Sequence, residues 1–84
     1  MDSFFVYIIY SPTLDIFYVG YSSNLEKRIL EHNAGISTYT SKAIDWELKW
    51  SKGFTSREQA MEQEKKIKFK KSRKYIEWLI ASTG

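Results

Sequence analysis

Two short apolar runs near the start of the chain predict a β-hairpin. Residues 4–10 are an unbroken stretch of aromatic and aliphatic side chains. A run without polar positions is typical of a strand that is buried on both faces, and therefore central in its sheet. Residues 16–21 form a second such run, and the intervening residues 11–14 supply a short turn in which Pro12 is well placed.

The register of this hairpin decides where its tyrosines point. If the pairing is symmetric about Pro12 and Thr13, Tyr7 lies directly opposite Tyr18, and both phenols leave the same face of the sheet. A slip of one residue would separate them, because successive side chains of a strand point to opposite faces.

A first helix is predicted by its start and stop signals. Residues 23–26, Ser-Asn-Leu-Glu, form a capping box, and Gly35 is suited to end the helix. The core-facing stripe consists of two residues, Leu25 and Ile29. Arg28 and His32 are four residues apart, so they lie together just beside that stripe.

The second half of the chain predicts one strand and two helices. Trp46, Leu48 and Trp50 alternate with polar residues, which indicates a half-exposed edge strand. A second capping box at residues 55–58 opens a helix that runs to about Lys70. A last helix begins at about residue 72 and presents four side chains to the core: Tyr75, Ile76, Leu79 and Ile80.

The predicted order is therefore β-β-α-β-α-α, an α+β fold in one small domain that spans residues 1–84. No stretch is long and apolar enough to cross a bilayer, and the first ten residues lack a basic leader and a cleavage site. We therefore expect a cytoplasmic location.

Composition narrows the metal chemistry. The chain has no cysteine and one histidine, so disulfides, thiolate sites and a multi-histidine zinc site are excluded within one chain. A bound metal should therefore be a hard ion with oxygen ligands, such as Mg2+ or Mn2+.

Basic residues are concentrated near the end of the chain. The net charge is only +3, but residues 65–74 include seven lysines or arginines. Such a run is either a solvated helix face or a track for the phosphates of a nucleic acid. The aromatic residues near it, Phe69, Tyr75 and Trp78, are expected mostly to be packed.

Glu64 is the acidic residue that its helical pattern singles out. Ala60, Glu64 and Ile67 follow the spacing of a core-facing stripe. A carboxylate in such a stripe is costly unless it is paired or binds a metal. The pattern alone leaves two interpretations equally open: metal binding, or a structural role in which Glu64 forms a salt bridge to Arg28 or reaches out past its neighbours.

Two motifs and three later residues resemble the GIY-YIG nuclease family, in particular its small stand-alone bacterial members that are labelled excision-nuclease C-subunit-like. Residues 5–7, Phe-Val-Tyr, and residues 18–20, Tyr-Val-Gly, correspond to the two motifs that name the family. Arg28, His32 and Glu64 follow in the family's order, and the resemblance extends from about residue 4 to about residue 80.

The resemblance implies a three-stranded antiparallel sheet flanked by helices, and a Mg2+-dependent (or Mn2+-dependent) endonuclease that hydrolyses phosphodiester bonds of DNA, in repair or processing. Glu64 would hold the metal ion, Tyr7 would accept a proton from water, and Arg28 would stabilise charge on the phosphoryl oxygens. Tyr18 and His32 would orient the reacting groups or relay the proton. A phenol is a weak base at neutral pH and needs nearby positive charge for this role.

Several residues differ from the family's pattern. The first motif lacks its glycine, and Tyr21 and Ser23 stand where excision-repair relatives carry lysines. No asparagine follows Asn33, although many relatives use one late in the domain. The missing lysines and asparagine predict a weaker hold on phosphate, and with it low activity or a narrow substrate range.

The expected partner is DNA, branched or damaged forms included. The residues predicted to contact it are Arg28, Thr40, Lys65, Lys68, Lys71 and Arg73. Affinity of the domain alone should be low, so a protein partner or a homo-oligomer is expected to add binding surface, and no membrane partner is expected.

Two other functions remain open from the sequence. The chain could be a nucleic-acid-binding module of the same fold with weak or absent catalysis, or a protein-interaction domain. The second alternative would use exposed tryptophans as anchors, from the set Trp46, Trp50 and Trp78.

Overall fold

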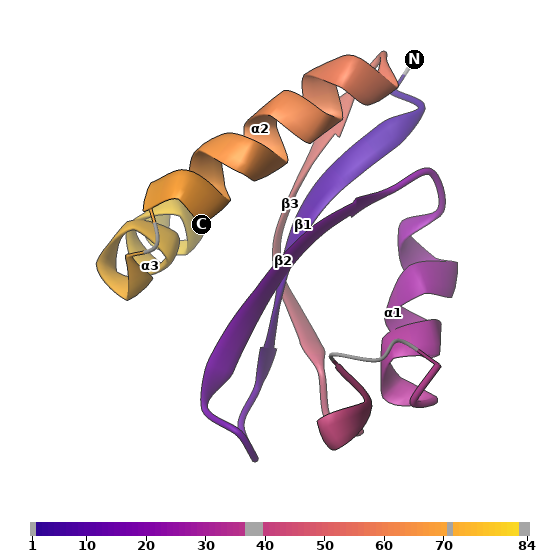
Figure 1. The fold of residues 1–84 in the computed structure, drawn as a ribbon, viewed down its shortest axis with the longest axis vertical. Coiled ribbons are helices and arrows are strands. Elements are labelled where there is room, and N and C mark those ends of the chain that lie inside the picture. Colours follow the sequence, from indigo (N-terminus) through magenta and orange to yellow (C-terminus); the bar gives the residue numbers. More distant parts are fainter. Residues whose placement is uncertain (1, 37–39, 71, 83–84) are drawn as a thin grey trace.

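A computed structural model describes residues 2–36, 40–70 and 72–82 of the chain. Three strands and three α-helices follow one another in the predicted order (Figure 1). Their bounds are β1 Phe4–Ser11, β2 Ile16–Ser22, α1 Leu25–Asn33, β3 Glu47–Phe54, α2 Arg57–Lys70 and α3 Arg73–Ser82, with a 3-10 turn η1 at Thr40–Lys42 between α1 and β3. No helix within these described ranges is long and apolar enough to cross a membrane.

The sheet is antiparallel, in the order β2-β1-β3. The strand β1 is central, as its unbroken apolar run predicts, and residues 6–9 of this strand are all buried. The α+β prediction with a three-stranded antiparallel sheet is therefore confirmed.

Helices cover both faces of the sheet, and each face has its own apolar cluster. In Figure 1, α1 lies on one side of the sheet, and α2 and α3 lie on the other. Val6, Ile8 and Trp50 pack in the cluster with α2 and α3, and Tyr7 and Ile9 pack in the cluster with α1. This alternation along β1 follows from the two-residue repeat of a strand.

The predicted hairpin register is wrong by two residues. Tyr7 pairs with Gly20, and Tyr18 pairs with Ile9. The centre of the turn lies one position later than predicted, because Asp15 closes the turn in the left-handed region (φ 53°) and donates its N–H to the Ser11 carbonyl at 2.7 Å. A two-residue shift preserves the alternation of faces, so both phenols still lie on the α1 side.

The third strand departs from the predicted alternation. Ile8 pairs with Trp50 and Ile9 pairs with Leu48, which is a β-bulge that leaves Lys49 without an opposite residue. The bulge turns Trp46 and Trp50 to opposite faces of the sheet, where they are 3% and 6% exposed. Neither is therefore an exposed anchor for a protein partner.

Both predicted capping boxes lie at helix starts, but each cap is one residue later than the first residue of its box. The side chains of Asn24 and Ser56 accept the N–H of the third residue that follows. Gly35 ends α1 with φ of 79°, as predicted, and the Ile36 N–H reaches back to the Glu31 carbonyl.

Candidate active site

The Tyr7 phenol occupies the space that a side chain at position 20 would need. A Cβ on Gly20 would lie 2.6 Å from the phenolic oxygen and 2.8 Å from Cζ of Tyr7. Gly20 is also the cross-strand neighbour of Tyr7. The missing side chain of Gly20 therefore gives the Tyr7 phenol its space.

His32 contacts Tyr7 from α1. The phenolic oxygen is 2.8 Å from His32 Nε2, and Nδ1 of the same ring is 2.6 Å from the Thr40 hydroxyl. Tyr7 is 1% exposed, and His32 and Thr40 are fully buried. Three polar side chains thus form a hydrogen-bonded chain inside the molecule, between β1, α1 and η1.

Burial lowers the pKa of His32 to about 4, and the positive charge of Arg28 acts in the same direction against the opposing charge of Glu31. The ring is therefore neutral at physiological pH. One of its nitrogens carries a proton and donates a hydrogen bond, and the other accepts a hydrogen bond.

Burial also raises the pKa of Tyr7 to about 12. Hydrogen bonding and charge from Arg28 oppose this shift, while the charges of Tyr18 and Glu64 add to it. The phenol is therefore fully protonated in this state, and it can take up a proton only if its own proton moves elsewhere.

Arg28 and Glu64 lie on two different helices, and the charge of each influences the pKa of the Tyr7 phenol. Arg28 on α1 forms an ion pair with Glu31 at 3.2 Å, and its side chain is 31% exposed. Glu64 on α2 is 17% exposed and lies 3.7 Å from Lys68. The salt bridges seen here are thus Arg28–Glu31 and Glu64–Lys68, in place of the Arg28–Glu64 pair that the sequence left open.

Tyr18 completes the group from the edge strand β2. Its ring meets the edge of His32, with 5.2 Å between ring centres, and Lys68 Nζ lies 5.8 Å from its centre. The structure therefore gathers all five predicted catalytic residues: Tyr7, Tyr18, Arg28, His32 and Glu64. The position of Lys68 beside Tyr18 and Glu64 was not predicted, because helical spacing relates Lys68 to Glu64 but does not show which strand α2 crosses.

Glu64 is the residue that could hold a metal ion here. Among the described residues, no three His, Cys, Asp or Glu side chains lie close enough together to hold a metal by themselves. A lone, half-buried carboxylate suits Mg2+, which usually keeps several waters and binds through one or two carboxylates together with substrate phosphates.

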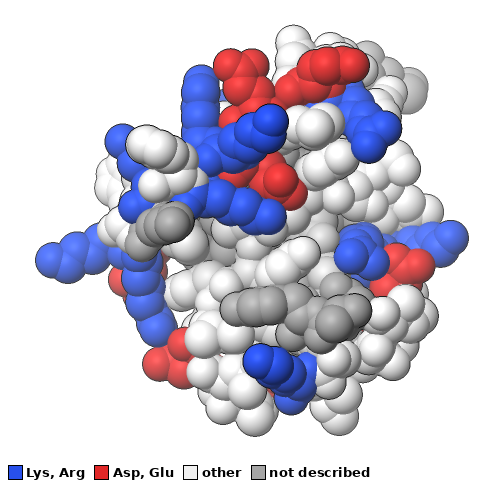
Figure 2. Space-filling view, in the orientation of Figure 1, with Lys and Arg blue, Asp and Glu red and all other residues white. Residues whose placement is uncertain are grey.

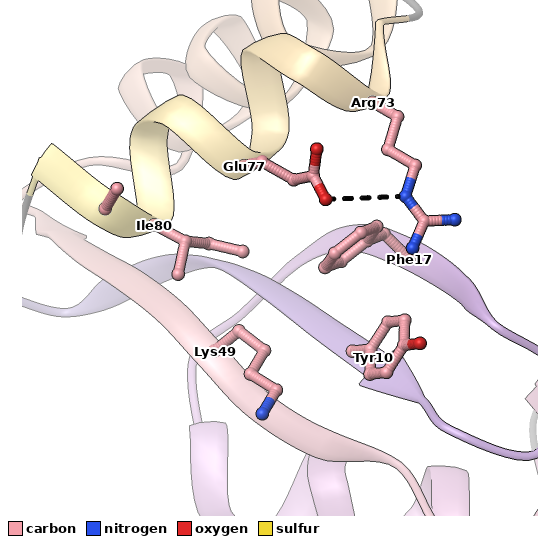
Figure 3. A pocket seen from close by; sticks show the side chains of 7 residues that line it. Tyr10, Phe17, Lys49, Arg73, Glu77 and Ile80 are labelled. Atoms are coloured by element: carbon pink, nitrogen blue, oxygen red, sulfur yellow. Dashed lines mark ion pairs between the residues drawn. The ribbon is translucent and has the colours of Figure 1, made fainter.

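Two residues that were predicted to contact nucleic acid, Thr40 and Arg73, have other partners in the structure. Thr40 is buried against His32, so its hydroxyl cannot reach a nucleic acid on the surface. Arg73 forms ion pairs with Asp15 at 2.8 Å and with Glu77 at 3.6 Å. It lines a separate cavity of about 380 Å³ between the hairpin and α3, beside Phe17 (Figure 3).

Two predicted contacts, the lysines Lys65 and Lys68, lie on the surface of α2. Lys65 and Lys68 are exposed, and Figure 2 shows Lys and Arg side chains crowded over α2 and α3 on one side of the molecule. Lys71 lies outside the described residues. The expectation that nearby aromatic residues are packed is confirmed for Tyr75 but is wrong for Phe69 and Trp78, which are 85% and 61% exposed.

This α+β fold carries two tyrosines on one face of its sheet, an arginine and a histidine on α1, and a carboxylate on α2. Such an arrangement is typical of a nuclease-type fold. The model of the GIY-YIG catalytic domain matches residues 3–76, and the chain belongs to the GIY-YIG family.

Curated relatives agree with this assignment. The chain is 34% identical over 64 residues to a UPF0213 protein of Streptococcus pneumoniae, covering 75% of this chain and 65% of the relative. It is 36% identical over 64 residues to a UPF0213 protein of Bacillus licheniformis (71% and 66%), and 37% identical over 65 residues to one of Natronomonas pharaonis (76% and 75%). The chain thus spans about two thirds of the length of the first two. No solved structure matches it significantly.

Proposed function

We propose that this protein is a Mg2+-dependent or Mn2+-dependent endonuclease that hydrolyses phosphodiester bonds of DNA. The observation that carries the proposal is the buried hydrogen bond of 2.8 Å between Tyr7 and His32, and the charges of Arg28 and Glu64 both influence the pKa of the same phenol. A phenol, an imidazole, a guanidinium and a carboxylate together supply proton transfer, phosphate binding and a hard metal ligand.

In the proposed reaction, Tyr7 takes a proton from the attacking water while its own phenolic proton moves to His32 Nε2. The water oxygen forms a bond to phosphorus, and the bond from phosphorus to the leaving ester oxygen breaks. The leaving oxygen then takes a proton from solvent. Arg28 stabilises the negative charge that grows on the phosphoryl oxygens, and Tyr18 keeps the imidazole in place through its edge contact.

The bound phosphate itself helps this proton transfer. Arg28 lowers the pKa of His32 in the free protein. A phosphate paired with Arg28 offsets that positive charge, so the imidazole becomes a better proton acceptor when substrate is present.

Glu64 would hold the divalent ion, which supplies positive charge next to the scissile phosphate. Lys68 is placed to exchange its contact with Glu64 for one with the phosphate, because its Nζ is 3.7 Å from the carboxylate and its side chain is half exposed. Lys65 and neighbouring lysines of α2 would bind the DNA backbone beside the cleavage point.

The same proposal includes four further points. The DNA is branched or damaged, and its cleavage serves repair or processing. A protein partner or a second copy of the chain adds binding surface, and the setting is the cytoplasm. Each follows from the sequence-based expectation and the family, and each requires its own measurement.

A catalytically weak nucleic-acid-binding module is the second candidate. It is favoured by the exposed lysines of α2 and by the Tyr7 phenol, whose raised pKa of about 12 keeps it protonated, so that it cannot accept a proton before it gives up its own.

One experiment separates the two candidates. Supercoiled and branched DNA are incubated with wild type and with Glu64→Ala over a Mg2+ titration, and binding of both variants to the same DNA is measured in Ca2+. The nuclease proposal predicts Mg2+-dependent nicking by wild type and none by Glu64→Ala, with binding retained. Binding without nicking in Mg2+ or Mn2+ would support the binding module, and nicking that survives Glu64→Ala would contradict the mechanism.

A further inference from the structure

The buried hydrogen-bonded chain does not end at His32. The Thr40 hydroxyl is 2.6 Å from Nδ1 of the imidazole, and Thr40 is fully buried. A hydroxyl can donate to or accept from a ring nitrogen. The direction of this bond therefore decides whether Nε2, the nitrogen that faces Tyr7, carries a proton or a free lone pair.

Thr40 is held in place by its own backbone. Its carbonyl accepts the indole N–H of Trp46 at 2.8 Å. The Asn33 side chain in turn bonds both the N–H and the carbonyl of Trp46, at 2.7 and 3.0 Å. Asn33 directly follows His32 on α1, so this loop of contacts ties the hydroxyl to the helix that carries the imidazole.

The charge of Arg28 decides between the two directions. The positive charge of Arg28 acts on both members of this pair, because it acts to lower the pKa of the Tyr7 phenol and that of the His32 imidazole. A positive charge near the phenolic oxygen favours the arrangement in which that oxygen keeps its lone pairs toward the charge and its proton is directed at Nε2. An Nε2–H dipole at the same place would point its positive end toward the guanidinium, which is unfavourable.

We propose that Thr40 is a positioning residue. Its hydroxyl accepts a hydrogen bond from Nδ1–H, which holds His32 in the tautomer whose Nε2 accepts a hydrogen bond from the Tyr7 phenol. The tautomer is a property of the folded protein itself, and its use in proton transfer rests on the proposed nuclease function. In the transfer, Nε2 gains the phenolic proton as Tyr7 gains one from water, and the imidazolium afterwards returns a proton to solvent.

The tautomer can be observed directly, because His32 is the single histidine of the chain. Protein without a histidine tag is labelled with 15N, and the ring nitrogens are correlated with the ring carbon-bound protons at pH 7. We expect a protonated Nδ1 and an unprotonated Nε2. A protonated Nε2 in wild type would overturn the proposal without any variant.

Variants of Thr40 test its role in setting the tautomer. Thr40→Val keeps the shape but removes the acceptor, so we expect the ring to shift toward the Nε2-protonated form. Thr40→Ser keeps the hydroxyl and should keep the wild-type spectrum. Thr55→Val makes the same chemical change at an exposed residue whose hydroxyl bonds Gln59, and should leave the ring signals unchanged. An unchanged tautomer in Thr40→Val would overturn the proposal.

Cleavage kinetics connect the tautomer to the reaction. We expect Thr40→Val to lower kcat by about tenfold or more with little change in KM, since it removes part of the contribution of proton transfer, and Thr40→Ser to restore it. Equal kcat for Thr40→Val and wild type would contradict the catalytic part. If no variant cleaves DNA at all, the nuclease proposal fails, while the NMR result still decides the tautomer.

Discussion

At the scale of single residues, Gly20 and Tyr7 form one unit across two strands. The absent side chain of Gly20 gives the phenol its position, and the position of the phenol allows its bond to His32. The motif glycine therefore has a steric reason that involves another motif residue and no special backbone angle.

Substitution of Gly20 by alanine tests this unit. The added Cβ would be 2.6 Å from the phenolic oxygen, so the ring must move and its bond to His32 must break. We expect a loss of about 1–3 kcal/mol in the free energy of unfolding, as is usual for overpacking, measured by urea denaturation, together with loss of cleavage.

Gly35→Ala is the matched control for this substitution. Gly35 has φ of 79° and no atom within 4 Å of an added Cβ, so alanine there should cost about 1 kcal/mol of backbone strain while the folded protein cleaves normally. Normal cleavage by Gly20→Ala would contradict the steric account.

The buried imidazole predicts how stability depends on pH. Folding lowers the pKa of His32 from 6.5 to about 4, so between these values the unfolded chain binds more protons than the native protein. Stability should therefore be full above about pH 6.5 and should fall at lower pH, by about 2 kcal/mol between pH 7 and pH 4.5. Urea denaturation at pH 7 and pH 4.5 measures this loss.

His32→Phe separates this effect from other groups, because it should remove most of the difference between the two pH values. The pKa values of Asp15 and Asp45 are lowered by hydrogen bonds, first from Arg73 and Thr13 respectively, so their contributions are lost only below about pH 4. A wild-type stability that is flat from pH 7 to pH 4.5 would show that the imidazole is not held neutral.

At the scale of elements, the strands and helices were predictable because their signals are local. The unbroken run of β1 and the caps at Asn24 and Ser56 specify elements within a few residues. The register of the hairpin was missed because it depends on the left-handed conformation of Asp15, and the faces of Trp46 and Trp50 were missed because a bulge has no clear sequence signal. The five catalytic candidates came from the family's motifs, and spacing alone did not show the contact between His32 and Thr40.

Substitution of Glu64 on α2 tests whether this carboxylate serves the fold or the reaction. Glu64 interrupts a stripe between the buried residues Ala60 and Ile67, and it forms a loose ion pair with Lys68 at 3.7 Å. We expect Glu64→Ala to change the free energy of unfolding by less than about 1 kcal/mol, because the lost pair is worth a few tenths of a kcal/mol and alanine favours a helix, while cleavage is abolished.

The control is Glu62→Ala, an exposed change on the same helix, which should alter neither stability nor cleavage appreciably. If Glu64→Ala instead unfolds the protein, Glu64 is a structural residue and its assignment as a metal ligand loses its basis.

At the scale of the whole molecule, the protein is small beside its proposed substrate. Its longest extent is 32 Å, which is close to one turn of B-DNA, about 34 Å. It can therefore contact few phosphates, and binding should be weak and strongly dependent on salt.

The salt dependence of binding counts these contacts. In a Glu64→Ala background that prevents cleavage, we expect Lys65→Ala to reduce the slope of log affinity against log salt by close to 0.9, the value for one phosphate contact. Lys52→Ala, at an exposed lysine of β3, should leave the slope unchanged. Equal slopes for Lys65→Ala and Lys52→Ala would mean that α2 is not the DNA-binding face.

The most direct test of the central claim compares wild type with Tyr7→Phe in single-turnover cleavage of supercoiled DNA in Mg2+. The substitution removes one oxygen from the hydrogen-bonded chain and keeps the ring that packs over Gly20. We predict a fall in the cleavage rate of about a hundredfold or more, with DNA binding close to wild type and a folded protein that is about 1–3 kcal/mol less stable, because Nε2 of the buried His32 loses its partner. A phenylalanine variant that cleaves at the wild-type rate would contradict the claim that Tyr7 moves the proton.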